Sequence, residues 1–181
     1  DESDEAVVLR AYERWGAELP RHVLGDFALA LWDARCRRLL CVRDRLGLKP
    51  FHYTWRRGVF RFASEARALL PALDRPEPDD AMVLAFLLRE FRPGDEGRTL
   101  LRDVHRLPPG HALVVDRDGP RRVRYWAPDP TRILELASDA EYVERFRGLF
   151  REAVAARLRT DWPVGALLSG GLDSSAIVGA A

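Results

Sequence analysis

A glycine-rich segment near the end of the chain constrains the fold more than any other feature. Residues 169–175 read Ser-Gly-Gly-Leu-Asp-Ser-Ser and stand between two apolar stretches, residues 164–168 and residues 177–180. The first stretch has the length and composition of a buried strand, and the second suits a helix packed on that strand. The order of strand, tight turn and helix predicts the opening of an α/β unit.

The same segment has the chemistry of an anion site. Adjacent glycines let main-chain N–H groups approach an anion closely, and the N-terminus of a helix favours negative charge. Serine hydroxyls add donors, and Asp173 is suited to hold Mg²⁺ against phosphate oxygens. We therefore expect ATP-Mg²⁺ binding, with Leu168 beside the adenine or ribose and Asp173 as the metal ligand. The expected ATP and pyrophosphate site comprises Leu168, Ser169, Gly170, Gly171, Leu172, Asp173, Ser174 and Ser175. The alternative is a serine- and glycine-rich turn in which Asp173 only caps the helix.

The upstream part of the chain has the pattern of antiparallel hairpins. Alternating apolar residues are separated by short polar turns, which is typical of paired strands. The predicted strands are residues 27–32 with 38–43, 51–55 with 59–63, and 111–115 followed by 123–126. Helices are expected at residues 3–15, with Ser3 as the N-cap, and at residues 81–90.

A proline-rich segment, residues 127–130, is the best candidate for a domain boundary. After it, Ser138 and Glu141 form a capping box that predicts the start of a long helix. Apolar residues recur along that helix at helical spacing, and we expect this stripe to form core. The stripe consists of Val143, Phe146, Phe150, Ala153, Val154 and Leu158.

Composition limits the classes of function. Charged residues make up 31% and hydrophobic residues 47%, which is typical of a folded protein. The formal net charge of +1 gives no support for nucleic-acid binding. No apolar run is long enough for a membrane span and no signal peptide is recognisable, so a cytoplasmic location is expected. The two cysteines and four histidines lack metal-ligand spacing.

Several motifs in order resemble the glutamine-hydrolysing asparagine synthetase family. They are Ser3-Asp4, the segment 25–33, the segment 43–50 (Arg-Asp-Arg-Leu-Gly-Leu-Lys-Pro), Phe62-Ala63-Ser64-Glu65, Leu107-Pro108-Pro109-Gly110-His111, and the glycine-rich segment. The resemblance implies two domains. Residues 1–127 would be most of an α+β N-terminal-nucleophile glutaminase domain, with antiparallel sheets flanked by helices and its N-terminal part missing. Residues 128–181 would begin an α/β ATP-pyrophosphatase (PP-loop) domain, so the chain is expected to be an internal fragment.

The resemblance also implies an activity and its reactants. ATP would adenylate aspartate, and ammonia released from glutamine would displace AMP. The nucleophilic N-terminal cysteine of the family is not in this chain, so no catalytic residue is expected here. Asp4 matches the aspartate that holds the amino group of glutamine. The substrates would be glutamine and aspartate, with no nucleic-acid or membrane partner, and the parent protein would be a homodimer.

One departure from the family pattern keeps other functions open. Asp26 stands where ammonia-channelling relatives usually have a methionine. A carboxylate at that position would bind ammonium and recruit water, which argues against a dry path for ammonia. One alternative is a relative of lasso-peptide cyclases or β-lactam synthetases, which would adenylate a peptide carboxylate or similar acid and close an internal amide. The other is an inactive fragment that retains weak phosphate binding.

Overall fold

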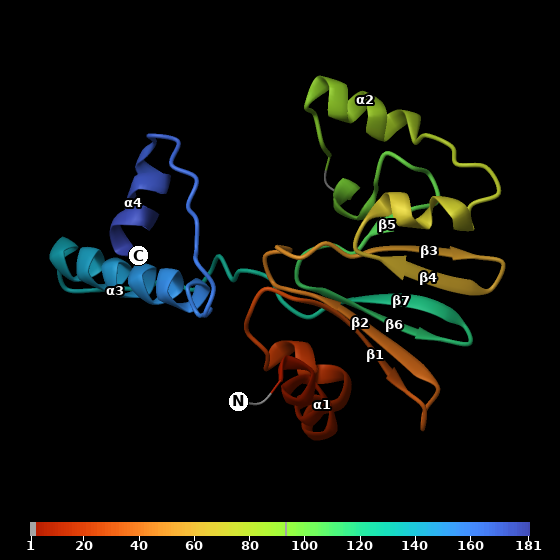
Figure 1. The fold of residues 1–181 in the computed structure, drawn as a ribbon, viewed down its shortest axis with the longest axis horizontal. Helices are drawn as coiled ribbons and strands as arrows, with labels where there is room; N and C mark the ends of the chain where they lie inside the picture. The colour runs from red at the N-terminus through yellow and green to blue at the C-terminus, as the bar shows by residue number, and fades with distance from the viewer. Residues whose placement is uncertain (1–2, 93) are drawn as a thin grey trace. The chain divides into compact units, whose positions relative to one another are not determined.

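The computed structural model describes residues 3–92 and 94–181. The chain divides into two compact units, Asp1–Pro128 and Asp129–Ala181. The first unit contains all the strands in the described residues, and the second contains two helices (Figure 1).

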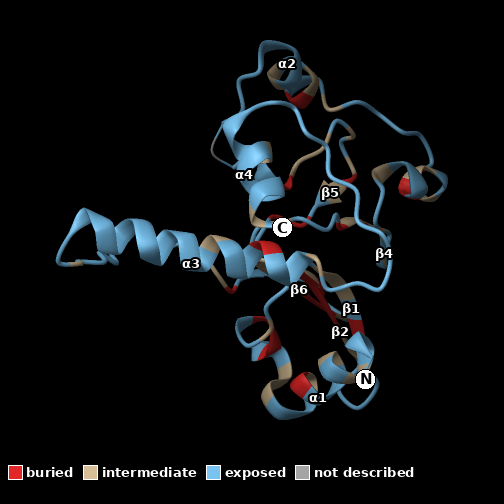
Figure 2. Cartoon of the chain, turned by 60° about the vertical axis from the view of Figure 1, so that its left-hand side comes forward, coloured by how far each residue is buried: buried red, intermediate tan, exposed pale blue. Residues whose placement is uncertain are grey.

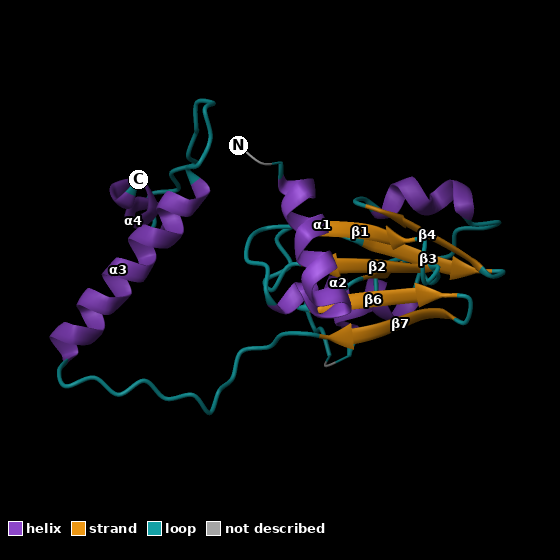
Figure 3. Ribbon diagram, turned by 90° about the horizontal axis from the view of Figure 1, so that it is seen from below, coloured by secondary structure: helices purple, strands orange, loops and turns teal. Residues whose placement is uncertain are grey.

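The first unit contains two antiparallel sheets (Figure 3). The four-stranded sheet has the order β1-β2-β6-β7, and the three-stranded sheet has the order β4-β3-β5. The strands are β1 (Ala28–Asp33), β2 (Arg38–Arg43), β3 (His52–Arg56), β4 (Val59–Ala63), β5 (His105–Arg106), β6 (His111–Asp116) and β7 (Gly119–Arg124). All three predicted hairpins form, although β7 begins four residues before the predicted strand 123–126.

Helical segments cover the outer faces of these sheets. In the first unit they are α1 (Asp4–Trp15), η1 (Gly16–Arg21), η2 (Ala66–Ala72), α2 (Asp80–Leu88) and η3 (Asp95–Gly97). The hydroxyl of Ser3 accepts a hydrogen bond from the amide of Ala6, so the predicted N-cap of α1 is confirmed. In Figure 1, α1 lies below the four-stranded sheet, whereas α2 lies above the three-stranded one.

Alternation along the strands produces a four-layer core. Leu40 and Val42 of β2 pack on α1, while Cys41, between them, faces Phe51 and the three-stranded sheet. A third cluster of buried residues, centred on Leu69 of η2, covers the outer face of the three-stranded sheet. The order of layers is therefore helix, sheet, sheet, helix, because successive side chains of a strand point to opposite faces.

The second unit contains α3 (Asp139–Arg157) and α4 (Leu172–Ala180). Ser138 caps α3 by accepting a hydrogen bond from the amide of Glu141, which confirms the predicted helix start. The prediction that the stripe on α3 forms core is wrong for this structure. Only Val154 of the stripe is buried, whereas Phe146 is 68% exposed. Most of α3 has the pale blue of exposed residues in Figure 2. Two helices and their connections enclose too little volume to bury a whole helix face.

Candidate functional site

The glycine-rich segment of the second unit forms a tight turn into a helix. Gly170 has a φ of 78°, a conformation that favours glycine, and Gly171 is the N-cap of α4. The Ser169 and Ser174 hydroxyl oxygens lie 3.0 Å apart, and the Ser174 hydroxyl donates to the Gly171 carbonyl at 3.2 Å. The turn predicted from the two glycines is therefore present, and the serine hydroxyls hold it together.

This geometry fits a polyphosphate. No side chain caps α4, so the amides of its first turn are open to an incoming anion. A Cβ added at Gly170 would meet nothing within 4 Å, which leaves open space on that side of the turn. Asp173 lies exposed in the first turn of α4, where a carboxylate beside bound phosphate requires a cation between them.

The strand predicted before this turn is not formed. Residues 164–168 have no regular secondary structure, and Leu168, expected beside the nucleotide base or ribose, is 61% exposed. A strand requires a neighbour to complete its main-chain hydrogen bonds, and residues 129–181 contain no strand. The prediction of a buried strand at residues 164–168 is therefore wrong for this structure.

Asp4, the predicted glutamine ligand, occupies the first turn of α1 in the first unit. Its carboxylate is exposed, which leaves it accessible to an ammonium group. Asp26 is also exposed and directly precedes Phe27, whose carbonyl accepts a hydrogen bond of 2.9 Å from the amide of Asp44. This hydrogen bond places the β2–β3 loop, residues 44–51, against the start of β1.

The β2–β3 loop is held by two buried charged residues. The Asp44 carboxylate accepts hydrogen bonds from the amides of Leu46, Leu48 and Lys49 at 3.1, 3.0 and 2.9 Å. The Arg43 guanidinium donates to three carbonyls, including that of Lys49 at 2.7 Å and that of Leu107 at 2.8 Å. Burial and the nearby Arg106 lower the pKa of Arg43. Both residues are more than 90% buried, so their charges are satisfied mainly by main-chain groups.

The same loop is bonded to the segment that leaves the first unit. The Tyr125 hydroxyl donates to the Arg43 carbonyl at 2.7 Å, and the amide of Gly110 donates to the Asp44 carbonyl at 3.0 Å. The carbonyl of Gly110 in turn accepts from the amides of Tyr125 and Trp126 at 2.9 and 3.2 Å. Burial, assisted by the charge of Asp44, raises the pKa of Tyr125 to about 12.

The sequence indicated a shaped loop at residues 43–50 but missed the role of Tyr125. The Gly-Leu-Lys-Pro ending signals a turn, whereas nothing in the local pattern around Tyr125 identifies a partner 82 positions away. The only available signal of buried charge was the consecutive pair Arg43-Asp44 at the end of an apolar stretch. Charged residues at such a position either end the strand or are buried with partners.

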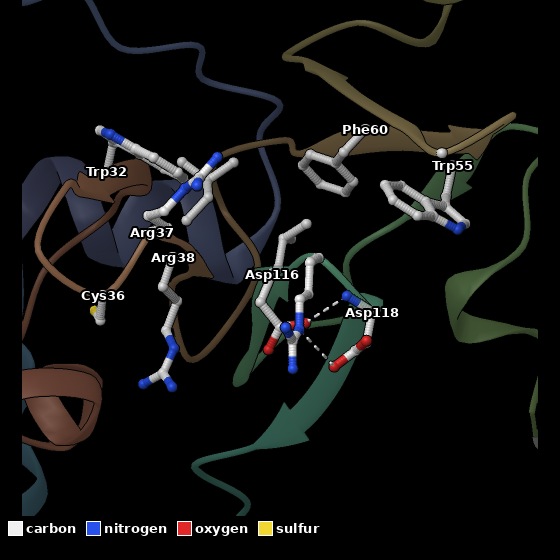
Figure 4. Close-up of a pocket in the computed structure, with 12 residues that line it drawn as sticks. Trp32, Cys36, Arg37, Arg38, Trp55, Phe60, Asp116 and Asp118 are labelled. Carbon is white, nitrogen blue, oxygen red and sulfur yellow. Dashed lines mark hydrogen bonds and ion pairs between the residues drawn. The ribbon is translucent and has the colours of Figure 1, made fainter.

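A cavity of about 810 Å³ lies elsewhere in the first unit (Figure 4). It is lined by residues near the turns of the three hairpins. One of them, Arg38, is at the start of β2, whereas the β2–β3 loop follows Arg43 at the other end of that strand. Its Asp116 carboxylate accepts a hydrogen bond from the amide of Asp118, which is itself paired with Arg117. These acidic groups therefore have partners, and none of the predicted site residues lines the cavity.

Within residues 3–92 and 94–181, no helix combines the length and apolar character of a membrane span. Within the same ranges, no group of three or more His, Cys, Asp or Glu side chains is arranged to hold a metal ion.

Comparison with known proteins shows the family. The sequence profile of the glutamine amidotransferase domain matches residues 1–126, which is more than half of the chain. The chain belongs to the glutamine amidotransferase family. A second profile, described as asparagine synthase, matches residues 145–181. The antiparallel sheets and flanking helices of the first unit fit the glutamine amidotransferase assignment.

Similar individual proteins carry two kinds of name. The chain is 37% identical to glutamine-hydrolysing asparagine synthetase 3 of Bacillus subtilis, over 97% of the chain and 28% of that protein. It is 34% identical to a putative glutamine-hydrolysing asparagine synthetase of Methanocaldococcus jannaschii, over 98% of the chain and 35% of that protein. It is also 35% identical to the amidase chyE of Penicillium rubens, over 98% of the chain and 26% of that protein. The chain thus spans about a quarter to a third of the length of these relatives.

Proposed function

We propose that this chain is part of a glutamine-dependent, ATP-consuming synthetase that forms an amide, with asparagine as its product. The observation that supports this proposal most directly is the open N-terminus of α4 behind the Gly170 turn. It lies in the same chain as a glutamine amidotransferase domain. A turn that binds the phosphates of ATP would allow such a protein to activate the carboxylate that accepts the released nitrogen. Such a turn is also the expected opening of a PP-loop domain.

The two units would divide the chemistry. In the first unit, Asp4 would bind the ammonium group of glutamine, while the nucleophile that attacks the side-chain amide would come from outside these residues. In the second unit, the amides after Gly171 and the hydroxyls of Ser169, Ser174 and Ser175 would bind the pyrophosphate part of ATP. Asp173 would hold Mg²⁺ beside the phosphates bound by these groups. Bound ATP-Mg²⁺ would supply the adenylate that activates the acceptor carboxylate.

Aspartate is proposed as the acceptor because two of the similar proteins described above are named asparagine synthetases. A second candidate is a cyclase that activates a peptide carboxylate or another acid and closes an internal amide. The exposed carboxylate of Asp26 favours this candidate, because an anionic, hydrated position attracts ammonium and is unsuited to a dry path for ammonia. The similarity to a protein named amidase shows that names in this family are not confined to asparagine synthesis.

The test is an assay of the full-length protein with ATP-Mg²⁺ and aspartate, supplied with either glutamine or ammonium chloride. Asparagine formed with both nitrogen sources, together with glutamate from glutamine, would support the proposal. Failure to form asparagine from either source would overturn the choice of aspartate. An internal amide formed from a peptide acid without any added nitrogen donor would select the cyclase.

The nucleotide site is tested by Asp173→Asn in the same full-length protein. We expect the rate of ATP–pyrophosphate exchange to fall about tenfold to a hundredfold, because the neutral amide of asparagine is a poor Mg²⁺ ligand. Asp161→Asn is the matched control, since Asp161 is an exposed aspartate of the same unit outside the turn. Exchange that survives Asp173→Asn as well as it survives Asp161→Asn would refute the role of Asp173.

A further inference from the structure

A network of hydrogen bonds joins three distant parts of the first unit. Phe27 at the start of β1, the β2–β3 loop, and the exit segment, residues 125–128, are far apart in sequence. The Asp44 amide binds the Phe27 carbonyl at 2.9 Å, and the Asp44 carbonyl accepts from Gly110 at 3.0 Å. Because Gly110 also accepts from the amides of Tyr125 and Trp126, all three parts meet at Asp44 and Gly110.

The side chain of Tyr125 bonds the exit segment directly to the base of the β2–β3 loop. Its hydroxyl donates to the Arg43 carbonyl at 2.7 Å, and the residue is only 9% exposed. Packing at this junction is close, because a Cβ on Gly110 would lie 2.6 Å from the carbonyl oxygen of Trp126. The Arg45 guanidinium also lies over the Trp126 ring, 5.7 Å from its centroid.

The β2–β3 loop borders an open cavity of about 630 Å³, lined in part by Arg43, Gly47, Arg106 and Pro109. Leu46 and Leu48 of the loop are exposed, at 67% and 54%. Leu46 and Gly47 of the loop line this cavity, so the position of the loop affects how far the cavity is open to water. That position depends on the hydrogen bond from Tyr125 as well as on the carboxylate of Asp44.

We propose that Tyr125 is a positioning residue that couples glutamine hydrolysis to amide formation. It fixes the β2–β3 loop against the exit segment, so that ammonia released in the first unit is used and not lost to solvent. This inference rests on the proposed function, in which ammonia is released by one unit and consumed by the other. Loosening the loop would open a route for water and ammonia without removing any group that binds glutamine or ATP.

The experiment is Tyr125→Phe in the full-length protein, which removes the hydroxyl and keeps the ring. Glutamate and asparagine are measured together, with glutamine as nitrogen donor, and asparagine is measured separately with ammonium chloride. We expect the asparagine formed per glutamate to fall about twofold to tenfold, which corresponds to the loss of one hydrogen bond. The rates of glutamine hydrolysis and of ammonium-driven synthesis should remain close to those of the full-length protein without the substitution.

Tyr53→Phe is the matched control, because Tyr53 is a half-buried tyrosine of β3 whose ring stacks on Phe60 of the neighbouring strand β4. It should leave the ratio of asparagine to glutamate unchanged. An unchanged ratio in Tyr125→Phe would overturn the inference. A parallel loss of both activities with a lowered melting temperature would also overturn it, since that result indicates a purely structural role.

The experiments distinguish failure of the proposed function from failure of the role of Tyr125. If the parent protein releases no glutamate from glutamine, the proposed function is wrong and the inference falls with it. If the parent protein couples the two reactions and Tyr125→Phe couples them equally well, only the inference is wrong.

Discussion

Replacement of Asp44 by alanine should destabilise the first unit more than any surface change. The carboxylate is 99% buried and accepts three main-chain hydrogen bonds, from Leu46, Leu48 and Lys49. A hydrogen bond to a charged group contributes about 1.5–3 kcal/mol, so three of them at the lower end of that range contribute about 4.5 kcal/mol. Since small domains have only about 5–15 kcal/mol of stability, Asp44→Ala should bring the unit close to unfolding.

The measurement is urea unfolding followed by tryptophan fluorescence, which reports mainly on the first unit because Trp162 is the only tryptophan after residue 128. With a slope of about 1.5 kcal/mol per molar urea, a loss of about 4.5 kcal/mol lowers the unfolding midpoint by about 3 M. Asp44→Asn should lower it by roughly half as much, since the amide oxygen still accepts from two of the three donors.

Asp116→Ala is the matched control for this prediction. The Asp116 carboxylate accepts one hydrogen bond from the amide of Asp118, at 2.9 Å, in an exposed turn. We expect its loss to cost about 1 kcal/mol or less. If Asp44→Ala and Asp116→Ala lowered the unfolding midpoint equally, the buried carboxylate would not be what holds the β2–β3 loop.

Two further predictions concern the same unit. Burial lowers the pKa of His52 below its usual 6.5, so the unfolded chain binds the proton first and stability should fall as pH decreases through 6.5 and level off below the folded-state pKa. Unfolding midpoints recorded from about pH 7.5 to about pH 5 should show a flatter profile for His52→Gln, and an identical profile would contradict this cause. Gly47→Ala should destabilise more than Gly58→Ala, because both glycines have a positive φ but only a Cβ at Gly47 would clash, 2.7 Å from Cγ of Pro109. Equal melting temperatures for the two variants would show that the loop relaxes around the methyl group.

Local patterns in the sequence were sufficient for most elements of the first unit. The hairpins, the Ser3 cap and the Ser138 cap depend on residues within a few positions of one another, and each is present in the structure. The prediction of a strand at residues 164–168 was wrong because a strand depends on a partner and not only on its own residues. Its apolar composition satisfies the pattern of a buried strand, but a strand forms only where another strand completes its hydrogen bonds.

For the candidate site, the sequence alone determined the glycine-rich turn, because the conformation of Gly170 and the helix start after Gly171 are local properties. The roles of Leu168, Asp173 and Asp4 in binding remain predictions, since they depend on ligands. The tertiary structure alone decided which distant groups bond to Arg43. The Leu107 carbonyl, 64 positions away, accepts from the buried Arg43 guanidinium, and the Tyr125 hydroxyl, 82 positions away, donates to the Arg43 carbonyl. Only the packing of the two sheets and the exit segment brings these groups together.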